Sequence, residues 1–269
     1  MGARVMTGVP RDPWAQLDWR TSARIAIGRA GASLPTREVL SFALAHARAR
    51  DAVRARFDRA ELGARLESLG LLVTNVESQA GNRSVYLRRP DLGRRLKPAS
   101  RDRLAKSAGE PACDLALMIG DGLSANAVAA NAPPMIEALL PFAESLGLTL
   151  GPVVIAEGAR VALGDEVGEI LGARLIAVLI GERPGLSAAD SLSIYLTYAP
   201  QIGRTDAERN CISNIRPGGL ASTAAAANLA WLIEAARAMR MTGIGLKDQS
   251  GIGQAASLAL AHSNPNASS

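Results

Sequence analysis

Cysteine, histidine and aromatic residues are all scarce in this sequence of 269 residues. The two cysteines, Cys113 and Cys211, lie far apart and form no CxxC pair, and His46 and His262 are the two histidines. This pattern predicts neither a zinc site nor a disulfide framework. The sequence also lacks an HExxH motif and a serine, histidine and aspartate in a recognisable triad context, which argues against a hydrolase of the triad kind.

Long apolar runs are missing as well. No apolar stretch reaches the ~18 to 20 residues that a membrane-spanning helix requires. The first residues do not show a basic segment followed by an apolar run, as a signal peptide would. We therefore expect a soluble, cytoplasmic protein with no membrane partner.

The positive charge of the sequence is concentrated in one segment. The formal net charge is +5, and residues 88–103 (RRPDLGRRLKPASRDR) alone hold seven Lys or Arg against two Asp. A charge confined in this way favours one local contact, with RNA, an acidic partner or a phosphate, although a solvated loop explains it as well. Tyr86 is the one aromatic residue near the segment, and single-stranded nucleic acid binds to stacked aromatic side chains. We therefore expect no nucleic-acid partner.

The sequence divides into four parts by its pattern of residues. Residues 1–18 are weakly patterned and are expected to form an arm, and residues 249–269 a flexible tail. Residues 19–105 are predicted to form a small, mostly helical N-terminal domain, with a second helix at 59–68. Its first helix begins at Pro35 and is expected to turn an apolar stripe toward a core. The stripe consists of Val39, Leu40, Phe42, Ala43, Leu44 and Ala47.

Residues 106–248 show short apolar runs that alternate with helical windows, which is typical of a parallel sheet with helices on both faces. We therefore predict an α/β fold, a Rossmann-like or flavodoxin-like three-layer sandwich with a parallel sheet, preceded by the small helical domain. The runs expected to be strands lie at 114–120, 152–156, 174–181, 191–199 and 210–215. Helices are expected at 124–144, 164–171 and 223–241.

Ligands of parallel α/β sheets bind at the carboxyl ends of the strands. The first predicted strand of the α/β part runs into GDGLSANA (120–127), in which Ser124 can cap the next helix and leave backbone N–H groups for a ligand. A tight turn needs glycine in any case, so a purely structural turn stays open as the alternative. A free-standing nucleotide-binding module or adaptor that uses this turn is a second hypothesis for the function.

Two further strands carry side chains that need an explanation. Glu182 follows a long apolar run in GERPGL (181–186), where its carboxylate must reach water or find donors. A pair with a cation or bonds from backbone N–H groups would satisfy it without any ligand. Cys211 lies within the predicted strand NCISNI (210–215), where a buried, inert thiol is the ordinary expectation. Residue patterns alone thus indicate an α/β protein with a ligand-binding edge and leave the ligand open.

Three segments carry a resemblance to a known family. They are ARVALGDEVGEILGARL (159–175), LIGERPGLSAADSLSIYLTYAP (179–200) and RNCISNIRPGGL (209–220). Over about residues 12–247 the chain resembles the small subunit of adenosylcobalamin-dependent ethanolamine ammonia-lyase. Further matching segments lie at 21–53, 86–96 and 114–128.

This resemblance implies a carbon–nitrogen lyase that converts ethanolamine to acetaldehyde and ammonia. In that family the small subunit forms a hetero-oligomer with a large barrel subunit, which holds the substrate and most of the radical chemistry. The resemblance therefore implies no catalytic residue in this chain and no activity of the chain alone. It also implies that residues 106–248 form a cobalamin-binding domain. The expected location of the protein is the cytoplasm or the inside of a bacterial microcompartment.

The cofactor that the resemblance implies is adenosylcobalamin, held at the interface between the two subunits. The positions that match the family's small-subunit contacts to it are Val161, Glu182 and Cys211. The rim of a corrin carries amide groups, so a carboxylate and backbone carbonyls are suitable acceptors for it. Gly181 and Gly185 would let the backbone come close to such a ligand.

A missing motif indicates how the cofactor is bound. The sequence has no DxHxxG motif, whose histidine replaces the nucleotide base on cobalt in base-off cobalamin proteins. We therefore expect a base-on cofactor and no metal ligand from this chain. The turn at 120–124 and the basic stretch 88–103 are the candidates to hold the nucleotide loop of the cofactor, and replacement of Arg94 and Arg95 would test the basic stretch.

Overall fold

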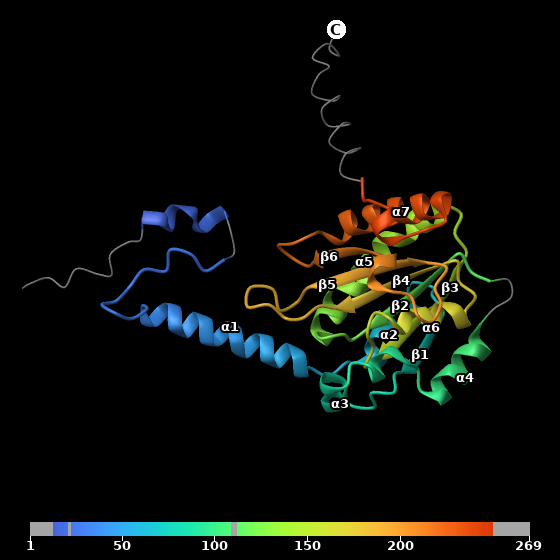
Figure 1. The fold of residues 1–269 in the computed structure, drawn as a ribbon, viewed down its shortest axis with the longest axis horizontal. Helices are drawn as coiled ribbons and strands as arrows, with labels where there is room; N and C mark the ends of the chain where they lie inside the picture. The colour runs from blue at the N-terminus through green and yellow to red at the C-terminus, as the bar shows by residue number, and fades with distance from the viewer. Residues whose placement is uncertain (1–12, 21–22, 109–111, 250–269) are drawn as a thin grey trace, which may run out of the picture.

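The computed structural model describes residues 13–20, 23–108 and 112–249. Within them, six strands form one sheet in the order β1-β3-β2-β4-β5-β6 (Figure 1). The strands are β1 Val73–Glu77, β2 Leu115–Gly120, β3 Leu150–Glu157, β4 Leu175–Gly181, β5 Leu192–Tyr198 and β6 Arg209–Ile215. The five strands expected between 106 and 248 are confirmed to within a few residues. The expectations for 1–12 and 250–269 lie outside the described residues.

The sheet is mixed, and the prediction of a parallel sheet is wrong at one side of it. The strands β1, β3, β2 and β4 run parallel, whereas β5 is antiparallel to β4 and β6 is antiparallel to β5. Residues 182–191 and 199–208, which connect these last strands, hold no α-helix. Parallel neighbours need a crossover of about a dozen residues or more, usually a helix, so these short connections require antiparallel pairing. The α/β class is confirmed. Within residues 106–248 the order β3-β2-β4-β5-β6, counted from β2, is the flavodoxin strand order, but β5 and β6 are paired antiparallel and β1 extends the sheet beyond β3.

Helices cover both faces of the sheet (Figure 1). One face packs against α2 (Arg59–Glu67), α5 (Ala125–Ser145) and α7 (Ser222–Met239) in an apolar cluster with Leu66, Leu139 and Leu229. The other face packs against α4 (Pro98–Ser107) and α6 (Leu163–Ile170), with Leu104, Leu163 and Val167 in its cluster. Shorter 3-10 turns lie at Pro13–Arg20, Leu92–Arg94, Asp206–Glu208 and Gly243–Gly245. The predicted helices at 59–68, 124–144, 164–171 and 223–241 are all present.

The N-terminal part of the chain contributes a strand as well as helices. Strand β1 lies inside the range 19–105 that was expected to be mostly helical, and it pairs in parallel with β3 at the edge of the sheet. Helix α2 begins at the N-cap Asp58, whose carboxylate accepts from the N–H groups of Ala60 and Glu61 at 3.1 and 3.0 Å. Helix α3 (Arg83–Arg88) follows β1. This part of the chain therefore helps to build the same carboxyl edge as the α/β part.

The first helix, α1 (Thr36–Arg54), forms where it was predicted, but its apolar stripe does not face a core. Val39, Leu40, Phe42 and Leu44 are exposed. Figure 1 shows the reason, because α1 runs outward from the body of the molecule and most of its length lies away from the sheet. Ala52, near its C-terminal end, is its buried residue among the described ones.

The connections after β2 and β3 leave the sheet on opposite faces. Strand β2 leads to α5 on one face, and β3 leads to α6 on the other. Such a divergence opens a crevice at the carboxyl ends of neighbouring strands, which is where ligands of open α/β sheets bind. The carboxyl ends of β2, β3 and β4 are therefore the first place to look for a site.

Candidate functional site

Two pockets lie next to each other at this carboxyl edge, and Tyr86 lines both. The larger has a volume of about 460 Å³, and its walls include Val161, Glu182 and Tyr195. The smaller has a volume of about 200 Å³, and Asp121 lies in its wall. The larger pocket falls in the size range of small-molecule sites.

Glu182 is held at the rim of the larger pocket by one of its two carboxylate oxygens. Its Oε1 accepts from the hydroxyl of Ser193 on β5 and from the backbone N–H of Asn214 on β6 at 3.0 Å. Among the described residues, Oε2 has no partner and no cation pairs with the carboxylate. The carboxylate is thus fixed by the chain's own donors and keeps one acceptor oxygen for a ligand.

The glycine before Glu182 is required by packing within the chain. A Cβ at Gly181 would lie 2.2 Å from the carbonyl oxygen of Ser124, and one at Gly122 would lie 2.2 Å from the carbonyl oxygen of Gly181. Gly122 also has a φ of +53°, which disfavours any side chain. A Cβ at Gly185 would meet its nearest neighbour at 3.6 Å, an ordinary contact. The end of β4 and the turn after β2 therefore interlock through their glycines.

Val161 lies in the turn between β3 and α6 and is half-buried on the pocket wall. Next to it, the guanidinium of Arg160 stacks 4.2 Å from the ring centroid of Tyr86. Tyr86 is buried and donates its hydroxyl to the carbonyl of Ala159 at 3.1 Å. The Nε of Arg160 is buried without a partner among the described residues. This wall therefore combines an apolar surface with a donor that has no acceptor.

Cys211 is exposed, so the expectation of a buried thiol is wrong. On β6 it pairs with Tyr195 of β5, and its thiol contacts the side chains of Tyr195 and Ser193. Burial raises the pKa of the thiol against the lowering effect of its contacts with Tyr195 and Ser193, so the thiol is neutral at pH 7. Because alternate residues of a strand share a face, Ser213 lies on the same face and extends it to the larger pocket. The structure brings Val161 and Glu182 into one pocket and places Cys211 on the sheet face that adjoins it.

The turn at 120–124 forms the predicted helix cap but offers few free N–H groups. Ser124 is the N-cap of α5, and its hydroxyl accepts from the N–H of Ala127 at 3.2 Å. The N–H of Leu123 donates to Gly181 at 2.9 Å, and that of Ser124 donates to Asp121 at 3.2 Å. Ser124 also donates its hydroxyl to the carbonyl of residue 189, which brings the loop after β4 over this end of the helix. The structure therefore gives no support to a phosphate cradle at this turn.

Asp121 ties the ends of three elements together in the smaller pocket. It is 5% exposed, and it accepts from the N–H of Ala159 at 3.0 Å and from Arg83 of α3 at 3.2 Å. Burial raises the pKa of this carboxyl to about 6, against the lowering effect of Arg83. Asp121 is a buried acid that links the ends of β2 and β3 to α3.

The basic segment 88–103 is folded, and most of its charged side chains have partners. Lys97, for example, pairs with Glu77 at 2.5 Å. The others with contacts are Arg88, Arg89, Arg101 and Arg103. Arg94 and Arg95 are exposed and have no side-chain partner among the described residues. They follow Gly93, whose carbonyl accepts from the N–H of Arg160 at 2.8 Å, so they lie beside the wall of the larger pocket.

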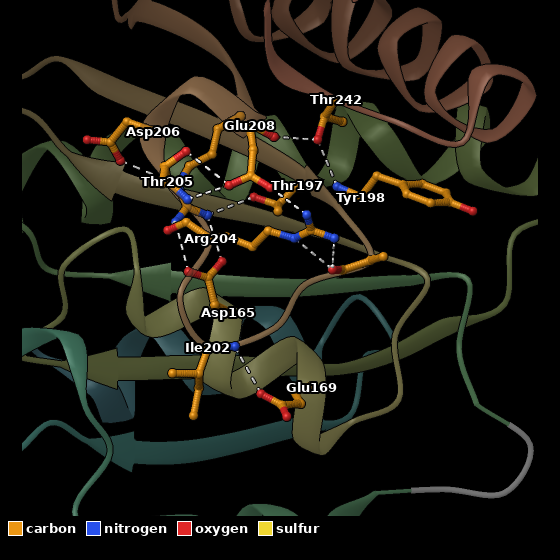
Figure 2. A network of polar contacts seen from close by, with 12 residues as sticks. Asp165, Glu169, Thr197, Tyr198, Ile202, Arg204, Thr205, Asp206, Glu208 and Thr242 are labelled. Carbon is orange, nitrogen blue, oxygen red and sulfur yellow. Dashed lines mark hydrogen bonds and ion pairs between the residues drawn. The ribbon is translucent and has the colours of Figure 1, made fainter. Parts of the chain in front are cut away.

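A buried ion pair joins α6 to β6, level with the beginning of β4 and not with its carboxyl end. Arg209 donates Nη1 and Nη2 to the two oxygens of Asp165 at 2.6 and 2.8 Å. Its Nη1 also donates to Thr197 of β5 at 3.0 Å. Figure 2 shows Asp165 and Thr197 within the surrounding polar network, which extends to Arg204 and Glu208. The network ties α6 to β5 and β6, and these two strands carry the pocket residues Ser193, Tyr195 and Ser213.

Comparison with known proteins gives the family. The chain matches the family model described as Ethanolamine ammonia-lyase light chain (EutC) over residues 11–247. The ethanolamine ammonia-lyase small subunit of Bradyrhizobium diazoefficiens is 57% identical over 243 residues, which cover 90% of this chain and 93% of the relative. The one of Rhodopseudomonas palustris is 57% identical over 230 residues, 86% of this chain and 88% of the relative. The chain belongs to the ethanolamine ammonia-lyase light chain family.

The ethanolamine ammonia-lyase light chain match includes every α-helix and strand described above, from α1 to α7. It also spans Val161, Glu182 and Cys211. A third relative, the ethanolamine ammonia-lyase small subunit of Xanthomonas campestris, is 50% identical over 245 residues, 90% of each chain. The resemblance seen in the sequence is thus confirmed at the level of the family. The name of these relatives, small subunit, implies a large partner in those proteins.

Neither a metal centre nor a membrane-spanning helix is found in the residues that the structure describes. No group of three or more His, Cys, Asp or Glu side chains there could hold a metal ion. No helix there is long and apolar enough to cross a membrane.

Several light chain residues at the site were not predicted from the sequence. Tyr86, Arg160, Ser193 and Tyr195 all line the larger pocket. A signal for two of them was present, because LSIYLTY (192–198) alternates apolar and polar residues, which is typical of an antiparallel strand with one open face. Tyr86 and Arg160 carried no comparable signal, since their stacking depends on the fold.

Proposed function

We propose that this chain is the small subunit of an adenosylcobalamin-dependent ethanolamine ammonia-lyase, which converts ethanolamine to acetaldehyde and ammonia. It joins a large catalytic subunit and holds part of a base-on cobalamin at the interface between them. It has no activity alone. The observation that carries this proposal is the open rim, where Val161 and Glu182 share one pocket beside the exposed Cys211.

The chemistry of this rim fits the edge of a corrin. Corrin amide groups donate N–H and offer carbonyl oxygens, so they need both acceptors and donors. The free oxygen of Glu182 is an acceptor, and the buried Nε of Arg160 is a donor that lacks an acceptor. Val161 adds apolar surface to the same pocket. Adenosylcobalamin supplies the radical chemistry that leads to cleavage of the carbon–nitrogen bond, and this chain supplies contacts that hold and orient the cofactor.

The size of the larger pocket supports a shared site. Its volume of about 460 Å³ suits one edge of a molecule as large as cobalamin, and not the whole of it. The polar face of β5 and β6 continues outward from the pocket through Tyr195 and Cys211. The remaining surface of the cofactor therefore has to be covered by a second protein.

Arg94 and Arg95 are the proposed contacts to the nucleotide loop of the cofactor. That loop contains a phosphodiester, which guanidinium groups bind through charge-assisted hydrogen bonds. Both side chains are exposed beside the pocket wall. The alternative, the turn at 120–124, already uses the N–H groups of Leu123 and Ser124 within the chain.

The test is reconstitution with an ethanolamine ammonia-lyase large subunit. We expect the two chains to co-purify, to bind adenosylcobalamin with visible corrin absorption, and to release acetaldehyde from ethanolamine. Either chain alone should show no deamination. Failure to form a complex, or full activity of the large subunit by itself, would refute the proposal. A thermal shift of this chain with nucleotides would then favour the nucleotide-binding alternative.

A further inference from the structure

Helix α1 exposes apolar side chains that its own chain does not cover. The exposed fractions are 49% for Val39, 64% for Leu40, 49% for Phe42 and 52% for Leu44. At about 100° per residue, these four positions spread over more than half of the helix circumference. A helix that is apolar around so much of its surface is stable in water only when another surface covers it.

The segment before α1 covers one side of the helix and leaves the other open. The guanidinium of Arg24 lies 5.7 Å from the ring centroid of Phe42, and Arg24, Leu34, Val39 and Phe42 line an apolar hollow of about 160 Å³. Leu40 and Leu44 do not line this hollow. Since they are four residues apart, they form one ridge along the uncovered side of the helix.

Helix α1 is attached to the molecule at the carboxyl edge that carries the candidate site. Near its C-terminal end, the carbonyl of Val53 accepts from the Nε of Arg83 at 2.6 Å, and Arg54 lines the smaller pocket. At the other end, Arg24 reaches the carbonyl of Leu186, in the loop after Glu182, at 3.5 Å. Figure 1 shows α1 running outward from α3 at this edge. A protein that covers the rim of the larger pocket would therefore meet α1.

We propose that the large subunit packs on α1, with Leu40 and Leu44 buried at the centre of the contact. This inference rests on the proposed function and adds to it the surface that recognises the partner. The helix carries four arginines against two carboxylates, so the complementary surface is an apolar groove with acidic side chains at its margins. The same charge opposes a contact between two copies of α1, because arginines would then face arginines.

Binding to the large subunit tests this inference with the full-length chain. The test variant is Leu40→Asp/Leu44→Asp, which places two carboxylates on the ridge. Since both side chains are exposed, the free chain should keep its circular dichroism spectrum and its melting temperature. We expect affinity for the large subunit to fall at least about tenfold, because buried unpaired carboxylates are costly.

Two matched variants control for surface apolarity and for shape. Leu72→Asp/Met239→Asp changes two exposed apolar residues away from α1, 79% and 50% exposed, and should leave affinity unchanged. Leu40→Met/Leu44→Met keeps apolar volume on the ridge and should retain binding. Loss of affinity in the Leu72/Met239 variant to the same extent as in the α1 variant would overturn the assignment of the surface.

Other outcomes separate this inference from the proposed function. If the α1 variant binds the large subunit as well as the wild type does, α1 is not the contact, and the proposed function stands. If the wild-type chain alone is a dimer that the α1 variant converts to a monomer, while binding to the large subunit is unchanged, a second copy covers the helix and the inference is wrong. If the wild type binds no large subunit, the proposed function itself fails.

Discussion

Arg209 and Asp165, which are 44 residues apart in the chain, form a bidentate ion pair in which each side chain is 2% exposed. Asp165 lies in the first turn of α6, four residues after Val161. Arg209 begins β6, two residues before Cys211. The pair therefore joins α6, which follows the turn that holds Val161, to β6, which carries Cys211, although neither of its members lines the pocket.

Breaking this pair should destabilise the protein. Arg209→Met leaves the buried carboxylate of Asp165 without its partner, so we expect a loss of about 3 to 5 kcal/mol in the free energy of unfolding. The double variant Arg209→Met/Asp165→Leu removes both charges and should recover most of that loss. Urea denaturation measures both values. A loss below about 1 kcal/mol in the single variant would contradict the role given to the pair.

Removing the carboxylate of Glu182 should weaken cofactor binding in the reconstituted complex. Glu182→Ala deletes an acceptor for the corrin amides and the anchor to Asn214. Because a charge-assisted hydrogen bond contributes about 1.5 to 3 kcal/mol, we expect the apparent Kd for adenosylcobalamin to rise about 10- to 100-fold. Titration followed by corrin absorbance gives the Kd, and Glu61→Ala on the exposed side of α2 is the control. An unchanged Kd for Glu182→Ala would remove this residue from the site.

The two cysteines should differ in reactivity. Cys211 is exposed and Cys113 is 8% exposed, so a thiol reagent should label Cys211 in the native chain and both residues after unfolding. The pKa of Cys211 is raised by desolvation, so labelling should be slow at pH 7 and accelerate toward pH 9 as the thiolate forms. Bound cobalamin should protect it. Native labelling that persists in Cys211→Ser would show that the assignment is wrong.

The buried Asp121 should give stability a dependence on pH. Its pKa is about 6 in the folded protein and about 3.9 in the unfolded chain, so raising the pH from 4 to 7 ionises the unfolded chain first and favours unfolding. Ionisation of the buried Asp121 therefore destabilises the folded protein by on the order of 3 kcal/mol at pH 7. Asp121→Asn keeps the acceptor for Ala159 and does not titrate. The difference in free energy of unfolding between this variant and the wild type should therefore move in favour of the variant as the pH rises from 4 to 7. A difference that stays constant over this pH range would contradict the raised pKa of Asp121.

Neutralising Arg94 and Arg95 together should reduce cobalamin affinity in the complex. Loss of charge-assisted contacts to a phosphodiester predicts about a tenfold rise in Kd, and the effect should shrink at high salt. Arg88→Ala/Arg89→Ala lies in the same basic segment, where both side chains have partners, and serves as the control. Equal affinities for the two double variants would leave the nucleotide loop without a contact in this segment.

The strands of the fold could be predicted from the sequence better than their directions. Strands β2 and β4 read as continuous apolar runs because both of their faces are buried. The reversal at β5 is not contained in the periodicity of any single strand, and only the short connection at 182–191 indicated it. The apolar stripe of α1 predicted the helix correctly, but periodicity cannot say whether its own chain covers it.

In the candidate site too, local sequence patterns predicted some residues, whereas the contacts between them depend on the fold. The apolar run that ends at Glu182 indicated a strand tip with a carboxylate, and the structure places Glu182 there. Its donors, Ser193 and the N–H of Asn214, come from 11 and 32 residues further along the chain. The stacking of Arg160 on Tyr86 spans 74 residues. Such pairings arise from the order of strands in the sheet, which no local pattern encodes.

The interlock of Gly122 and Gly181 has a consequence for assembly. Because the turn after β2 and the end of β4 fit together only when both positions lack a side chain, the rim takes its final shape as the strands pair during folding. The edge that Glu182 occupies is therefore preorganised before any encounter, and docking there proceeds without further loss of backbone entropy at that edge.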